Sequence, residues 1–99
     1  MYAPIREATV KPEGQDQLQR ALQEFGTIRG QQPGFRGILS IDAGNACRVT
    51  VLPWDDLAAH QTAQLTLGPL FARLIEPHMT GPSALAYEGP VTVDTIRTR

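Results

Sequence analysis

The sequence predicts an α+β fold in which helices cover one face of an antiparallel sheet, with elements in the order βαββαβ. Residues 35–41 and 46–52 both have the composition of strands. The segment between them, Asp42-Ala43-Gly44-Asn45, suits a hairpin turn because its residues tolerate positive φ. Residues 18–28 place apolar side chains three and four positions apart, the spacing of an amphipathic helix. The whole order is that of a ferredoxin-like sandwich.

The first half of the chain supplies one strand and one helix. Residues 3–10 carry β-forming side chains, and Pro4 is compatible with the start or the edge of a strand. Residues 11–14 break this strand, and the amphipathic helix follows until Gly30 and Pro33-Gly34 stop it. The apolar stripe of that helix consists of Leu18, Ala21, Leu22, Phe25 and Ile28.

The second half supplies another helix and the last strand. Asp55 is expected to cap the helix, where its carboxylate also favours the positive end of the helix dipole. Gly68-Pro69 predicts a division into two helical pieces. The last strand is expected from about Ala84, with a bend or bulge at Gly89-Pro90, and residues 91–96 should continue as an extended arm.

Alternation along the two central strands leaves neither face polar throughout, so both faces of the sheet should be covered. Helices cover one face. We expect a second copy of the chain to cover the other, giving a homodimer through the sheet faces with residues 91–96 against the partner. A chain of 99 residues buries a smaller fraction of its apolar surface than a larger domain does, which also favours self-association.

Composition indicates a single globular domain over residues 1–99, with 41% hydrophobic and 19% charged residues. The net charge is −1 and the basic residues are scattered, so nucleic acid is not expected as a partner. No signal peptide or membrane span is recognisable, which predicts a cytoplasmic protein. Cys47, the single cysteine, excludes an intrachain disulfide and is expected to be a buried, inert thiol.

Three stretches resemble a known family. They are residues 11–14 before the amphipathic helix, residues 33–37 at the start of the second strand, and Trp54-Asp55-Asp56-Leu57, where a strand ends and a helix begins. In these features the chain resembles the antibiotic biosynthesis monooxygenase domain family of dimeric α/β barrels, over nearly its whole length. Members include cofactor-free oxygenases of polycyclic aromatic polyketides, quinol oxygenases, haem-degrading enzymes and proteins of no known activity.

The sequence departs from the haem-degrading members, which use an asparagine on the first strand and a histidine late in the second helix. The first strand here has Arg6, Glu7 and Thr9 as its polar residues. His78 follows Pro77, where the helix should already have ended. The departure disfavours haem degradation.

The resemblance therefore implies a cofactor-independent monooxygenase that acts on an aromatic or quinol-type small molecule. Such an enzyme needs a base, hydrogen-bond donors and a dry cavity. His60 is the candidate catalytic base, with a half-exposed surface histidine as the alternative. Trp54 and Tyr87 are candidate pocket walls and donors, with core packing as the alternative. Arg36, like Arg48, could hold an anionic substrate or pair with a surface carboxylate.

Neither a cofactor nor a metal is implied, because the two histidines and one cysteine lack the spacing of a metal site. A different class of function also fits the sequence: a non-catalytic dimer that binds a small molecule as a sensor, or acts as a scaffold. The interior of the protein distinguishes these readings. A packed interior without a cavity large enough for a ring system would favour the scaffold.

Overall fold

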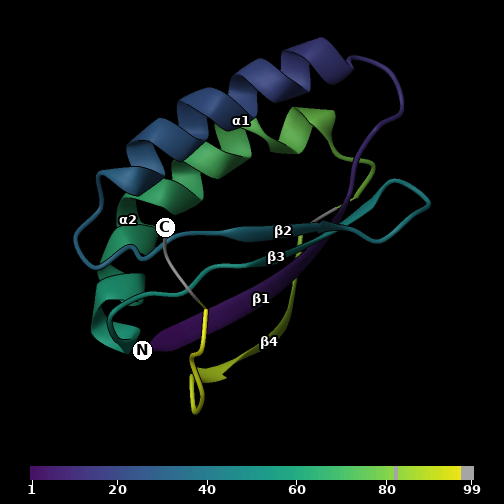
Figure 1. Cartoon of the computed structure of the whole chain (residues 1–99). Coiled ribbons are helices and arrows are strands. Elements are labelled where there is room, and N and C mark those ends of the chain that lie inside the picture. The colour runs from purple at the N-terminus through teal and green to yellow at the C-terminus, as the bar shows by residue number, and fades with distance from the viewer. Residues whose placement is uncertain (82, 97–99) are drawn as a thin grey trace.

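The computed structural model describes residues 1–81 and 83–96, and it confirms the predicted ferredoxin-like α+β fold (Figure 1). Its antiparallel sheet has the strand order β2-β3-β1-β4. Two helices, α1 and α2, lie together on one face of the sheet, and a short 3-10 helix, η1, follows α2 (Figure 1). The elements are β1 (Tyr2–Thr9), α1 (Gln15–Gly30), β2 (Leu39–Asp42), β3 (Cys47–Val51), α2 (Leu57–Leu74), η1 (Glu76–His78) and β4 (Ala84–Pro90).

The second strand is shorter than predicted. β2 begins at Leu39, and Phe35 forms only an isolated bridge with Trp54. Between them Gly37 has a φ of 131°, a conformation that interrupts regular strand pairing and that glycine tolerates best. The hairpin turn lies where it was predicted, and the Asp42 carboxylate accepts a hydrogen bond from the Gly44 N–H at 3.0 Å.

The cap of α2 is Asp56, so the prediction of Asp55 was wrong. The Asp56 carboxylate accepts a hydrogen bond from the Ala59 N–H at 2.8 Å, three residues into the helix, which is the contact that defines a side-chain cap. The Asp55 carboxylate lies one residue too early for this contact. It accepts a hydrogen bond from the Arg36 guanidinium instead, at 3.2 Å.

The predicted break at Gly68-Pro69 was also wrong, because α2 runs through both residues. Pro69 lacks the N–H that would donate to the Leu65 carbonyl, so one helical hydrogen bond is absent there. Leu65 is 80% exposed, which shows that this stretch faces solvent and that water can reach the freed carbonyl. Figure 1 shows α2 bending between its teal first part and its green second part.

The bulge in β4 lies at Ala86 rather than at the predicted Gly89-Pro90. Tyr87 pairs with Ile5 and Leu85 pairs with Arg6, which leaves Ala86 as the extra residue. Pro90 ends the strand opposite Tyr2, and β4 is an edge strand, where a residue without an N–H is tolerated. Residues 91–96 form no strand within this chain.

The core lies between the helices and the sheet. It consists of Phe25, Trp54, Ala63, Leu67, Ile75 and Met79. Cys47 lies outside it and is half-buried, where full burial was expected. Neither helix in the described ranges is long and apolar enough to cross a membrane.

Candidate active site

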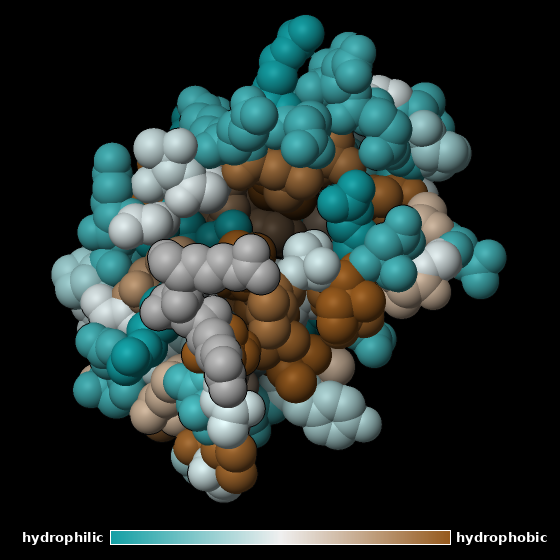
Figure 2. Space-filling view, in the orientation of Figure 1, coloured by the Kyte–Doolittle hydropathy of each residue, from teal (hydrophilic) through white to brown (hydrophobic). Residues whose placement is uncertain are grey.

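A cavity of about 480 Å³ lies between the helices and the face of the sheet that they cover. Its volume falls within the range of about 300–1,000 Å³ that is usual for small-molecule sites. Figure 2 shows the surface hollowed at this place, with apolar side chains inside the opening and hydrophilic ones around it. Both helices and the strands β1, β2 and β3 contribute to the lining.

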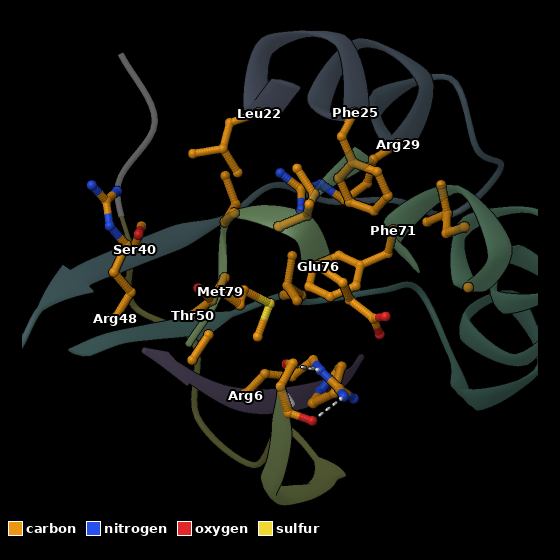
Figure 3. Close-up of a pocket in the computed structure, with 18 of the residues that line it drawn as sticks. Arg6, Leu22, Phe25, Arg29, Ser40, Arg48, Thr50, Phe71, Glu76 and Met79 are labelled. Carbon is orange, nitrogen blue, oxygen red and sulfur yellow. Dashed lines mark hydrogen bonds between the residues drawn. The ribbon is translucent and has the colours of Figure 1, made fainter. Parts of the chain in front are cut away.

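The sheet presents polar side chains to the cavity. Thr50 of β3 lies between Arg6 of β1 and Ser40 of β2, and all three line the cavity together with Arg48. Residues opposite one another in antiparallel strands share a face, so this row follows from the register. Arg6 is fixed in place, because its Nε donates to the Ser83 Oγ at 3.0 Å and its Nη2 to the Ser83 carbonyl at 3.3 Å (Figure 3).

One end of the cavity is aromatic. Trp54 is 1% exposed, and its ring centroid lies 5.2 Å from that of Phe35 and 5.8 Å from that of His60. Reciprocal backbone hydrogen bonds of 2.9 and 2.7 Å between Tyr2 and Trp54 hold the end of β3 against the start of β1. Tyr2 also packs on His60, with the ring centroids 5.9 Å apart. His60 thereby contacts two aromatic rings.

Three buried side-chain nitrogens of the described residues lack a hydrogen-bond partner: Arg29 Nε, Trp54 Nε1 and His60 Nδ1. All three residues line the cavity. Buried polar groups are nearly always paired in native proteins, because an unpaired one costs about 1–3 kcal/mol. Their gathering around one cavity indicates a site whose hydrogen bonds are completed by what it binds.

Burial lowers the pKa of His60 below its usual value of 6.5. The nearby Glu88 carboxylate opposes this shift in the pKa, while the Arg6 guanidinium adds to it. Since burial has the largest effect, the imidazole is neutral at pH 7. A neutral imidazole that lines a cavity is of the right kind to act as a general base.

The structure brings together two of the four residues singled out from the sequence. His60 and Trp54 both line the cavity, whereas Arg36 and Tyr87 do not. Arg36 is at the surface, paired with Asp55. Tyr87 is 75% exposed and lies opposite Ile5, on the face of the sheet that no helix covers.

Two further arginines of the lining were missed by the sequence analysis. Arg29 follows Phe25 by four residues, so it continues the apolar stripe of α1 toward the sheet. Arg6 lies two residues from both Pro4 and Ala8, which also line the cavity. Each arginine is a charged residue at the spacing of the buried side chains in its own helix or strand. That spacing is the signal that could have identified both arginines.

Histidine, cysteine and acidic side chains do not cluster in a way that could hold a metal ion anywhere in the described ranges, 1–81 and 83–96. The remaining histidine, His78, is half-buried in η1 and does not line the cavity.

Comparison with known proteins gives matches in structure but none in sequence. No protein-family model matches the sequence, and no curated protein matches it. A protein of unknown function from Nitrosomonas europaea has a TM-score of 0.77 at 11% identity, covering 99% of this chain and 95% of that one. An antibiotic biosynthesis monooxygenase structure has a TM-score of 0.70 at 22% identity, covering 98% of this chain and all of that one (100%).

SnoaB from Streptomyces nogalater, a cofactor-independent oxygenase, has a TM-score of 0.70 at 15% identity, with 97% of each chain covered. This chain has the fold of the antibiotic biosynthesis monooxygenases. At these identities the likeness is one of fold, which many unrelated activities can share. The activity must therefore be argued from the cavity of this chain.

Proposed function

We propose that this protein is a cofactor-independent monooxygenase acting on an aromatic or quinol-type small molecule. The observation that carries the proposal is the cavity that His60 and Trp54 both line, with His60 Nδ1 and Trp54 Nε1 buried beside it without a hydrogen-bond partner. His60 would act as the base and Trp54 as a wall and hydrogen-bond donor. The shared fold with SnoaB, a cofactor-independent oxygenase, supports the same reaction class.

The reaction begins with removal of a proton from the substrate. Neutral His60 accepts a proton from the acidic CH₂ of an anthrone-type ring, or from the hydroxyl of a phenol. The resulting anion is electron-rich. The Trp54 N–H can donate a hydrogen bond to its oxygen, and the positive charges of the lining favour the negative charge.

The anion then supplies the electrons that dioxygen needs. It transfers one electron to O₂, and the substrate radical and superoxide combine to form a C–O bond. The peroxide takes the proton back from His60, after which the O–O bond breaks, the second C–H proton leaves and water departs. The sum, R₂CH₂ + O₂ → R₂C=O + H₂O, balances without an added reductant.

The helical wall of the cavity suits this chemistry because it presents apolar and aromatic side chains. Phe25, Leu67 and Phe71 of the two helices face the sheet across the cavity. The Phe25 and Phe71 rings form an edge-to-face pair with centroids 5.6 Å apart. Flat apolar walls of this kind also favour a ring system as the ligand.

The alternative class of function is a non-catalytic binder or scaffold, and it can be distinguished from an oxygenase by oxygen uptake. A scaffold without a pocket loses its support, because the interior holds a cavity of about 480 Å³. A non-catalytic binder would occupy this cavity without consuming oxygen.

Oxygen uptake by the purified protein tests the proposal. A panel of anthrones, naphthols and quinols is supplied under ¹⁸O₂ with no cofactor added and with chelator present. We expect uptake with at least one compound and one ¹⁸O atom in its product. Turnover that continues unchanged without oxygen, or binding without uptake across the panel, would contradict the proposal.

We also propose that the protein is a homodimer joined through the uncovered face of the sheet. This outer face carries apolar side chains from all four strands: Ile5, Leu39, Ile41, Cys47, Val49, Val51 and Tyr87. Leu39 and Ile41 are 50% and 52% exposed. Residues 91–96 add Val93 and Ile96, which are 77% and 68% exposed. A second copy would bury this surface.

A further inference from the structure

We propose that the ligand of the cavity is an anion, a ring compound bearing a carboxylate, and that Arg29 binds the carboxylate. The inference rests on the proposed function only in placing the ligand in the same cavity. It adds a chemical class and a recognition residue that the reaction itself does not require, since an anthrone or a quinol needs no carboxylate.

The first observation is the charge of the lining. The cavity has three arginines, Arg6, Arg29 and Arg48, and Glu76 is its one acidic residue. Among the described residues the only ion pair is that between Arg36 and Asp55, at the surface. No carboxylate of the described chain therefore forms an ion pair with an arginine of the cavity, although the chain as a whole has a net charge of −1.

The second observation is the state of Arg29 itself. Its Nε is buried without a hydrogen-bond partner. Arg6, by contrast, is held by Ser83. Burial lowers the pKa of the Arg29 guanidinium, the direction expected where water is withdrawn from a charge without a counter-charge. A partly buried, unpaired charge is costly in the free protein, and an anionic ligand would relieve that cost.

The third observation is the geometry around Arg29. Its guanidinium carbon lies 5.1 Å from the ring centroid of Phe25 and 5.7 Å from that of Phe35. Figure 3 shows Arg29 beside Phe25 and Phe71 and far from Arg48 and Ser40 in the view. The guanidinium is thereby fixed against aromatic walls. A planar guanidinium matches a carboxylate with two parallel hydrogen bonds, which selects this group over a single oxygen.

These contacts also orient the ligand. Phe35 touches both Arg29 and Trp54, and Trp54 in turn touches His60. Arg29 and His60 also both line the cavity, so a ring whose carboxylate lies on Arg29 would extend toward His60. Arg29 would act as the anchor at one end, and His60 as the base at the other.

Calorimetric binding of two matched compounds to the full-length protein tests the inference. 2-Naphthoate carries the carboxylate, and 2-naphthamide has the same shape without the charge. We expect 2-naphthoate to bind about 10- to 100-fold more tightly, the range expected for hydrogen bonds between charged groups. Equal affinities would overturn this inference and leave the proposed function standing. If neither compound binds, the premise that the cavity binds a ring compound is wrong, and both proposals are overturned.

Variants assign the effect to Arg29. In Arg29→Gln we expect the affinity for 2-naphthoate to fall to that for 2-naphthamide, while the affinity for 2-naphthamide stays unchanged. Arg29→Lys should retain part of the preference, which keeps the test valid if the glutamine variant does not fold. Arg20→Gln removes an exposed arginine of the same helix and should retain the full preference. Equal weakening of both compounds in Arg29→Gln would show a structural role and overturn the assignment.

Discussion

The two faces of this sheet differ in what covers them and in the side chains that they carry. The inner face, which the helices cover, presents Arg6, Ser40, Arg48 and Thr50 to the cavity. The outer face, which nothing in this chain covers, presents aliphatic side chains such as Ile41 and Val49. In a sheet with one wet face the apolar side chains would lie under the helices. Here the covered face combines these polar residues with apolar ones such as Leu52 and Trp54, and the uncovered face carries mainly apolar residues, of which Leu39 and Ile41 are 50% and 52% exposed.

The difference indicates that the two faces bind different partners: a small molecule on the inner face and another protein surface on the outer face. Enclosed arginines and unpartnered nitrogens suit a polar or charged small molecule, because they gain the hydrogen bonds that the free protein lacks. Exposed aliphatic strands suit another protein surface, because burial of their side chains stabilises by about 25 cal/mol per Å². Substitutions on one face should therefore leave the property of the other face unchanged.

The largest effect is expected from His60→Gln on the inner face. Loss of a general base lowers turnover by about 100- to 10,000-fold, so we expect a fall in kcat/KM within that range, measured by oxygen uptake. The dimer should persist in the same samples. His78→Gln is the matched control, because His78 lies outside the cavity. Equal loss in both variants, or unchanged turnover in His60→Gln, would contradict the assigned role.

On the outer face, Ile41→Asp should separate the dimer into monomers. An unpaired charge in a buried interface costs about 3 kcal/mol or more, so the dissociation constant should rise at least about 100-fold in sedimentation equilibrium. Leu65→Asp is the control, because it places the same charge on an 80% exposed side chain of α2. A dimer that survives Ile41→Asp would show that the outer face is not the interface.

A smaller effect is expected from removal of residues 91–99. Val93 and Ile96 are largely exposed in the single chain, so burial against a partner would add a secondary contact. We expect the dissociation constant of the dimer to rise about tenfold, while the affinity for a cavity ligand stays the same. An unchanged dissociation constant would show that this arm does not contact the partner.

The smallest effect is a displacement of the pH profile. Because burial lowers the pKa of His60, its neutral, base form persists below pH 6.5. The midpoint of the decline in turnover on the acid side should therefore lie below pH 6.5. A plot of log kcat/KM against pH measures this decline. A decline centred above 6.5 would show that His60 is stabilised in its charged form.

Much of the difference between the two faces can be predicted from the sequence, and the predictions that fail do so at particular residues. Alternation correctly groups Arg48, Thr50, Leu52 and Trp54 on one face of β3, which the structure turns toward the cavity. The same alternation groups Arg36 with Ile38 and Ser40. Only Ile38 and Ser40 line the cavity, because Gly37 interrupts the strand between them and Arg36.

Other failures arise where the position of a side chain depends on contacts distant in sequence. Tyr87 was expected in the pocket wall or the core, but its register opposite Ile5 places it on the outer face. No local pattern fixes that register, and a shift of one residue would reverse every side chain of a strand. Asp55 and Asp56 are adjacent and both can cap a helix. Which one does so depends on where the helix begins, and neighbouring residues compete for that position.

Quenching of the Trp54 fluorescence, with oxygen uptake followed in the same cell, tests the central claim most directly. Trp54 is the only tryptophan, is buried, and lines the cavity, so it reports on the occupancy of this site. We predict saturable quenching by a hydroxylated ring compound, with oxygen consumed in proportion to the compound converted and no cofactor added. Saturable quenching without oxygen consumption by any compound of the panel, or no quenching at all, would contradict the account.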